Sequence, residues 1–172
     1  MSLPSRFRAA ATTVAFAGAA LAGAIGLPST PAMAEAAAAP PPGCTGPVSN
    51  TWLNVIVENV RNSEGLVAVT LYADNSRKFL IKHGSLYVGR ADAHAGTTRT
   101  CIFVPQPGIY ALALYHDENA DRKFDRTTIG LPAEGYGFSN NPSTLAGLPS
   151  FRSVRLAVPR TGLTARVQMK YP

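Results

Sequence analysis

Short runs in which apolar and polar residues alternate constrain the fold of this chain more than any other feature. In the clearest run, near the C-terminus, Leu163, Ala165, Val167 and Met169 alternate with polar residues. A period of two places such apolar side chains on one face of a β-strand. Strands are also predicted around residues 51–58, 66–72, 86–88, 100–104, 109–116 and 153–158.

The arrangement of these runs predicts the fold class. The sequence has no internal repeat and no helical period long enough to cross a parallel sheet. We expect an all-β fold, an Ig-like or transthyretin-like (prealbumin-like) antiparallel β-sandwich of about seven strands, with one long loop. Turn residues at 61–65 and 159–162 predict two hairpins, and residues 77–83, which end before Gly84, predict one short helix. Tyr110, two residues after Gly108, fits either a tyrosine corner or an ordinary core position.

The first residues resemble a targeting segment. Arg6 and Arg8 precede an uncharged, Ala-rich run, and the small residues Ala32 and Ala34 follow it. This pattern predicts a cleaved signal peptide over residues 1–34. The alternative, a retained membrane anchor, is disfavoured because the run is short of the roughly 20 strongly apolar residues that a span needs. We expect an Ala/Pro-rich lead-in at 35–49, a single domain at 50–172 with no integral membrane segment, and a periplasmic or secreted location.

Cysteines and charge narrow the functional classes. Two cysteines, Cys44 and Cys101, predict a disulfide in an exported chain, the alternatives being free thiols or lipidation at Cys44. The formal net charge is +6. The basic residues are dispersed, without the stripe that nucleic-acid binding requires, so we expect no nucleic-acid partner.

An acidic loop follows the strand predicted at 109–116. Oxygen-bearing side chains recur at Asp117, Asn119, Asp121 and Asp125, a spacing that lets one loop surround a hard cation, so Ca2+ is a candidate cofactor. Glu118 or Glu134 would supply a further ligand. The EF-hand pattern is not met, because it requires a glycine at Arg122 and a glutamate at Thr128. The alternative is a metal-free turn held by Asx-type hydrogen bonds and by exposed ion pairs with neighbouring basic residues.

A second polar stretch follows at residues 136–142. It places two aromatic residues and two amides among glycines, and with His116 it forms a candidate ligand surface: His116, Tyr136, Phe138, Asn140 and Asn141. The alternative is that Tyr136 and Phe138 fold back to close one end of the sandwich. Ser139, His116 and Asp117 contain the residue types of a hydrolase triad, but the Gly-x-Ser-x-Gly elbow is missing.

Taken together, residues 116–125 and 130–141 resemble a bacterial family of unknown function, DUF2141. The strand that opens with Gly65 and the strand that begins at Gly108 fit as well, and the resemblance covers residues 50–170. It implies an exported, single-domain β protein without an assigned activity. Members often carry glycine where this chain has Arg122. The loop is also similar to those of carboxypeptidase-regulatory-like and adhesin-type sandwiches, in which such acids bind calcium. The C-terminus lacks the Tyr-Arg-Gly-Ser tail of transthyretin-like hydrolases.

Three functional hypotheses follow. The first is a non-enzymatic binding or structural accessory at the cell envelope, with an envelope protein or a glycan as partner and with calcium held in the acidic loop. The second is a hydrolase of an envelope polymer or a small ester that uses Asp117, Glu118 or His116 as acid or base. The third is a carbohydrate-binding module that uses Tyr136 and Phe138.

Overall fold

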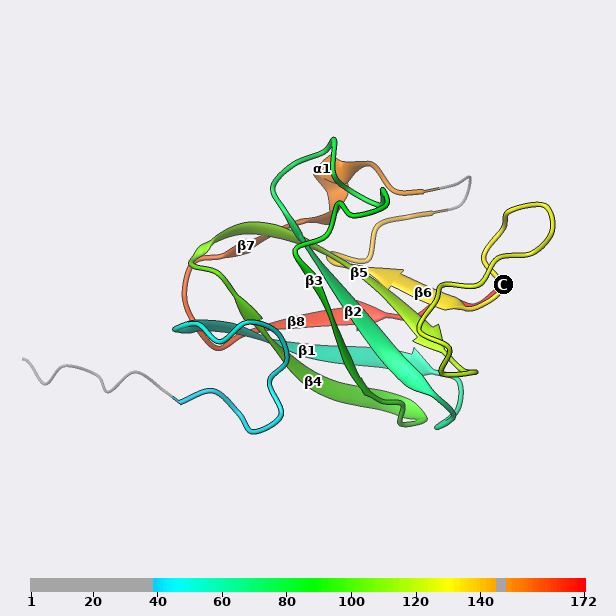
Figure 1. Ribbon diagram of the computed structural model, residues 1–172, viewed down its shortest axis with the longest axis horizontal. Helices are drawn as coiled ribbons and strands as arrows, with labels where there is room; N and C mark the ends of the chain where they lie inside the picture. The colour runs from blue at the N-terminus through cyan, green and yellow to red at the C-terminus, as the bar shows by residue number, and fades with distance from the viewer. Residues whose placement is uncertain (1–38, 145–147) are drawn as a thin grey trace, which may run out of the picture. The chain divides into compact units, whose positions relative to one another are not determined.

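The computed structural model describes residues 39–144 and 148–172, which belong to one compact unit, Ala36–Pro172. Within these residues the chain forms eight strands and one short helix in two packed sheets (Figure 1). The all-β sandwich predicted from the sequence is therefore confirmed. The signal peptide predicted over residues 1–34 lies outside the described residues. Among the described helices, none is long and apolar enough to cross a membrane.

The smaller sheet has three strands in the order β4-β1-β8. The central strand β1 (Thr51–Val60) pairs antiparallel with β4 (Gly96–Val104) and parallel with β8 (Leu163–Gln168). Leu53, Val55 and Val57 of β1 are buried, as the alternating pattern predicts. This face forms one side of the main core.

The larger sheet is built around β5 (Gly108–Asp117). On one side β2 (Leu66–Ala73) pairs with β5 and then with β3 (Tyr87–Asp92). On the other side two short strands share the edge: β6 (Gly135–Phe138) pairs with residues 113–116, and β7 (Arg155–Val158) pairs with residues 108–111. The helix α1 (Phe151–Val154) leads directly into β7.

Both predicted hairpins are wrong. The strands β1 and β2 lie in different sheets, and so do β7 and β8. Each connecting turn crosses from one sheet to the other, as Greek-key connections do. The alternation of residues is right in all four strands, because alternation depends only on which side of a strand faces the core.

The predicted helix over residues 77–83 is also wrong, since this segment is a series of turns. Leu80 and His83 have positive φ angles, 58° and 60°, which an α-helix does not allow. The segment instead anchors one aromatic residue, Phe79, whose ring lies 5.2 Å from Tyr72 and 5.4 Å from Phe151. The short helix of the structure is α1.

The tyrosine corner is confirmed. Tyr110 is buried at the start of β5, and its hydroxyl donates a 2.7 Å hydrogen bond to the backbone carbonyl of Gln106. Residues 105–107 carry the chain from β4 in one sheet to β5 in the other. The hydrogen bond therefore fixes the corner at which the two layers join.

The disulfide between Cys44 and Cys101 is present and ties the segment before β1 to β4. Thr45 continues this attachment, because its N–H donates to the carbonyl of Cys101 and its carbonyl accepts from Phe103. Trp52, Cys101 and Phe103 form a buried cluster on the outer side of the small sheet, with Cys44 packed against them. A disulfide indicates an oxidising compartment.

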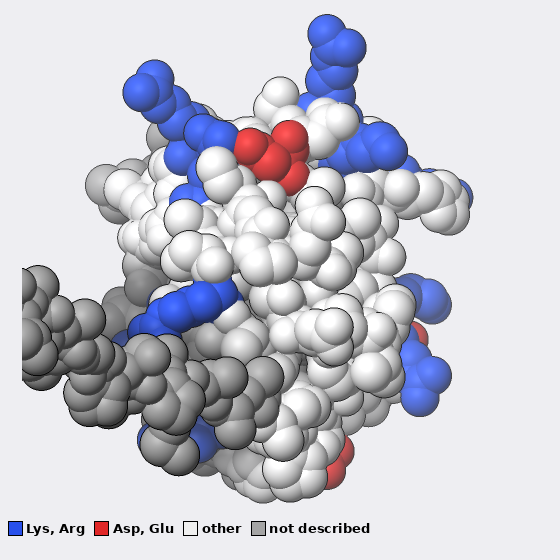
Figure 2. Space-filling model, turned by 90° about the vertical axis from the view of Figure 1, so that its left-hand side faces the viewer, with Lys and Arg blue, Asp and Glu red and all other residues white. Residues whose placement is uncertain are grey.

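On the face shown in Figure 2, several Lys and Arg side chains lie around a small acidic patch at the end of the fold that carries α1, and others are dispersed over the rest of this face. The bidentate ion pair of Arg155 with Asp74, at 2.7 and 2.6 Å, fastens β7 to the turn after β2. Much of the face shown in Figure 2 is uncharged.

Candidate ligand pocket

The larger sheet carries apolar side chains on both faces. One face contributes to the main core, and the outer face supports a second cluster made of Tyr72, Phe79, Ala111, Phe138 and Val154. Partly buried Leu80, Ala113, Tyr136 and Phe151 pack against this cluster. Exposed apolar surface beside such a cluster is typical of a binding site.

Strand register determines the shape of this outer face. One row across the sheet places Thr70 opposite Ala113, and Ala113 opposite Phe138. The neighbouring row places Tyr115 opposite Tyr136. Because the small side chains of Thr70 and Ala113 lie between larger aromatic ones, they form the floor of a hollow.

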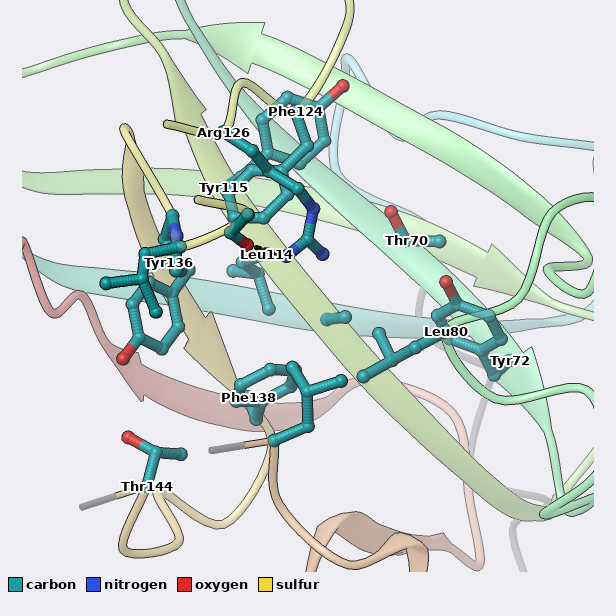
Figure 3. Close-up of a pocket in the computed structure, with 15 residues that line it drawn as sticks. Thr70, Tyr72, Leu80, Leu114, Tyr115, Phe124, Arg126, Tyr136, Phe138 and Thr144 are labelled. Carbon is teal, nitrogen blue, oxygen red and sulfur yellow. Dashed lines mark hydrogen bonds between the residues drawn. The ribbon is translucent and has the colours of Figure 1, made fainter. Parts of the chain in front are cut away.

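The hollow is a pocket of about 660 Å³. Its walls include Tyr72 and Leu80 on one side and Phe124 and Arg126 on the other, with Tyr136 and Phe138 from β6 between them (Figure 3). This volume lies within the range of about 300–1,000 Å³ that is usual for small-molecule sites. The lining is mainly apolar and aromatic, as in such sites.

The glycines of β6 explain why its two aromatic residues face this pocket. A Cβ atom at Gly135 would clash with the ring of Tyr171, and one at Gly137 would clash with Val167 and with the carbonyl of Gln168. Only glycine therefore lets the C-terminal segment pack on the inner side of β6. Tyr136 and Phe138 then face outward, which differs from the expectation that they close one end of the sandwich.

The acidic loop that follows β5 forms one wall of the pocket. Asp117 is fully buried, and its carboxylate accepts hydrogen bonds from the N–H groups of Asp121 at 3.1 Å and Arg122 at 2.8 Å. Asn119 and Asp121 each accept an N–H from two residues further on, at 3.1 and 2.8 Å. These are the Asx-type hydrogen bonds that were predicted from the sequence as the alternative to a metal site. They hold the loop that carries Phe124 and Arg126.

Calcium binding by Asp117, Asn119, Asp121 and Asp125 stays a prediction. The Asn119 amide donates to Asp125 at 3.2 Å, and Lys123 lies 4.0 Å from Asp121, so side-chain oxygens of the loop already have partners. In residues 39–144 and 148–172, no three His, Cys, Asp or Glu side chains come together in a way that could hold a metal ion.

The two glutamates near the loop have different environments. Glu134 is buried and accepts the N–H of Asp125 at 3.0 Å. Burial raises its pKa, and repulsion from Asp117, Asp125 and Asp121 adds to this effect. Glu118 instead faces Arg61 and Asn62, and its hydrogen bond from Arg61 is the main reason that its pKa is lowered.

The other predicted site residues do not gather at the pocket. His116 is fully buried, with its ring nitrogens 2.8 Å from the Tyr171 hydroxyl and 2.8 Å from the Glu64 carbonyl. The amide of Asn140 donates to the carbonyls of Ser153 and Arg155, and that of Asn141 donates to Arg166. Of the predicted ligand surface, only Tyr136 and Phe138 line the pocket.

Ser139 does not meet the requirements of a nucleophile. Its hydroxyl is buried and bonded to the backbone of Leu112 and Val154, whereas the His116 ring has Tyr171 and Glu64 as partners. Neither His116 nor Asp117 lines the pocket. The residues of the suggested triad therefore have separate hydrogen-bond partners elsewhere in the fold.

Sequence reasoning missed the floor and the far wall of the pocket. Thr70 and Ala113 are unremarkable in a strand, and only the pairing of β2 with β5 brings them together. Tyr115, Phe124 and Arg126 form a contiguous series, with 5.6 Å between the two tilted rings and 5.1 Å from the guanidinium carbon to the Phe124 ring. The sequence signal that could have indicated the floor is the presence of the small residues Thr70 and Ala113 in strands that otherwise carry bulky residues.

The fold and the pocket define a class of protein, a small disulfide-linked β-sandwich with a ligand-sized hollow on the outer face of one sheet. Within that class, the sequence model of a family described as an uncharacterized protein conserved in bacteria (DUF2141) matches residues 55–165. The chain belongs to this family. Searches of curated proteins and of solved structures give no significant match.

Proposed function

We propose that this protein is a non-enzymatic binding protein of the bacterial cell envelope, which takes a small, mainly apolar ligand in the outer-face pocket. The observation that carries the proposal is the hollow of about 660 Å³ with the small Thr70 and Ala113 at its floor and aromatic rings around it. Burial of a ligand against such rings is favourable by about 25 cal/mol for each Å² of apolar surface removed from water.

The disulfide and the N-terminal pattern support an envelope location, periplasmic or secreted, because disulfides persist in oxidising compartments. The hydrolase hypothesis has less support. Of the residues named for it, His116 and Asp117 are buried and bonded elsewhere, Glu118 is bonded to Arg61 and Asn62, and the pocket lining contains none of the three.

A glycan is the second candidate ligand. It is favoured by Tyr136, whose half-buried ring lies 6.0 Å from that of the buried Phe138 at the pocket and would stack on a sugar face. The amides of Asn140 and Asn141, which would have supplied polar contacts, donate to backbone carbonyls instead. An apolar ligand therefore fits the lining better.

The test is equilibrium binding of a neutral fluorescent probe, N-phenyl-1-naphthylamine, followed by its emission. We expect saturable binding to the wild type and its loss in Ala113→Phe, which fills the floor. Ala157→Phe, the same change at an exposed position of β7 outside the pocket, is the matched control and should bind normally. Equal binding by all three proteins would contradict the proposal. Competition by soluble oligosaccharides, but not by alkanols, would favour the glycan.

A further inference from the structure

Arg126 is the only charged residue among the described residues that line the pocket. Its guanidinium carbon lies 5.1 Å from the centre of the Phe124 ring, and its Nη1 donates to the carbonyl of Gly130 at 2.9 Å. Figure 3 shows the side chain crossing beside Phe124 and ending within the circle of lining residues. These contacts hold a positive charge at the pocket.

The charge of Arg126 is not neutralised by a neighbouring acid in the described part of the chain. The Lys and Arg ion pairs found there involve Arg61, Lys123, Arg155 and Arg166. The acids of the same loop have other partners, since Asp117 and Asp121 accept backbone N–H groups. A guanidinium has five N–H donors, and the described residues accept from only one nitrogen of Arg126, which leaves donors for an anion.

The rim of the pocket beside Arg126 is apolar and well defined. Ile129 and Leu131 are 79% and 57% exposed at the tip of the loop. The turn at the tip is closed by two backbone hydrogen bonds, because Thr127 donates its N–H to Leu131 at 2.8 Å and accepts from Gly130 at 2.8 Å. A ligand whose charged end lies at Arg126 would place its adjacent methylene groups against Leu131, which lines the pocket.

We propose that the ligand is a single-chain amphiphile with a carboxylate head, whose chain lies on the floor of Thr70 and Ala113 and whose carboxylate binds Arg126. This inference rests on the proposed function of the pocket and names its ligand class. A carboxylate carries one charge and matches the planar guanidinium in a bidentate pair. A phosphate monoester carries about 1.5 to 2 charges and would need a second cation, which the described lining does not offer.

The test compares dodecanoate with dodecanol, which share one chain and differ in the head. Each competes at pH 7, as monomer, against N-phenyl-1-naphthylamine bound to the full chain. Since Arg126 is exposed, we expect dodecanoate to bind wild type about two- to fivefold more tightly than dodecanol. Arg126→Gln should lose this preference. Arg122→Gln, in the same loop but outside the pocket lining, should keep it.

A charge reversal separates ligand recognition from a structural role. Arg126→Glu should prefer dodecylammonium to dodecanoate, a reversal that mere disturbance of the loop would not produce. Arg126→Lys should keep the preference for the acid. If circular dichroism indicates that the glutamine variant is unfolded, the loss of preference is tested with Arg126→Glu instead.

Two results would overturn the inference alone. One is that wild type binds dodecanoate and dodecanol equally while probe binding is still lost in Ala113→Phe. That result would indicate an apolar pocket that does not select the head group. The other is co-sedimentation with vesicles of phosphatidylglycerol without binding of monomeric dodecanoate, which would indicate a membrane surface as the source of the anion. A probe insensitive to Ala113→Phe would overturn the proposed function as well.

Discussion

The hydroxyl of Tyr110 donates a hydrogen bond to the backbone carbonyl of Gln106 across the corner where the chain passes from β4 to β5. The two residues are four positions apart, yet they link the two layers of the sandwich. The hydrogen bond lies at the start of the strand whose other end leads into the pocket wall. Its contribution to stability is open to direct measurement.

Tyr110→Phe should lower the free energy of unfolding by about 1 kcal/mol, the usual net contribution of one hydrogen bond. The ring remains to fill the core, so little else should change. Urea unfolding followed by circular dichroism measures the difference. Tyr136→Phe removes a hydroxyl for which no hydrogen bond is found among the described residues, and it should leave stability unchanged. Equal losses in both variants would contradict the role of the corner.

Glu134 should make stability fall as pH rises. Its pKa is raised in the folded chain, chiefly by burial, above the ordinary value of 4.5. The folded chain therefore binds this proton more tightly, and the resulting stabilisation, complete below pH 4.5, is lost as pH rises through the folded pKa. In Glu134→Gln this loss should disappear, while the amide oxygen still accepts from Asp125. Urea unfolding between about pH 4 and 8 measures the difference from wild type.

Glu118→Gln is the matched comparison, with the opposite sign. The pKa of Glu118 is lowered, first by its hydrogen bond from Arg61, so its stabilisation is present above 4.5 and lost as pH falls through the folded pKa. This variant should be less stable than wild type at neutral pH, with the difference vanishing in acid. If the stability of the two variants relative to wild type changed with pH in the same direction, the opposite pKa shifts of Glu134 and Glu118 would be contradicted.

Removal of the disulfide should destabilise the domain considerably. Cys44 and Cys101 are 57 residues apart, and closing a loop of that length stabilises the fold by about 4 kcal/mol in the chain-entropy model. The double variant Cys44→Ala with Cys101→Ala and the reduced wild type should both show this loss in urea unfolding. Reductant should have no effect on the double variant. Unchanged stability after confirmed reduction would count against this estimate.

Calcium should leave the melting temperature unchanged. The carboxylates of Asp117 and Asp121 already accept backbone N–H groups, so these hydrogen bonds hold the loop in shape without an ion. Thermal melts in calcium chloride and in chelator, followed by circular dichroism, measure the effect. A rise in melting temperature with calcium that is abolished in Asp125→Asn would establish the cation site predicted from the oxygen spacing instead.

Asp117→Ala should be strongly destabilising whether or not calcium binds. The side chain is fully buried and accepts two N–H groups, and its removal leaves the Arg122 N–H without this partner, whereas the Asp121 N–H keeps its hydrogen bond to the Asn119 side chain. The expected loss is about 2 kcal/mol or more in urea unfolding, because each unsatisfied buried group costs about 1–3 kcal/mol. Asp121→Ala, at an exposed position, is the control and should lose much less.

The long connection after Asp117 contains a strand that its sequence pattern does not predict. Its glycines and prolines predict an irregular loop, but residues 135–138 form β6. The strand was hidden because Gly135 and Gly137 supply no apolar side chains on the inner side. They are required there by the close approach of Tyr171 and Val167, and these contacts involve residues about 30 positions away.

The sequence by itself determined the strands other than β6 and the family, it predicted the disulfide, and it offered the tyrosine corner as one of two alternatives. Each depends on a period of two, on two cysteines or on a short motif, which are local properties of the chain. Tertiary structure alone decided that β1 and β2 separate into different sheets, that β8 runs parallel to β1, and that Thr70 meets Ala113. The physical reason is that alternation specifies which side of a strand is buried, whereas pairing depends on the combined packing of both sheets.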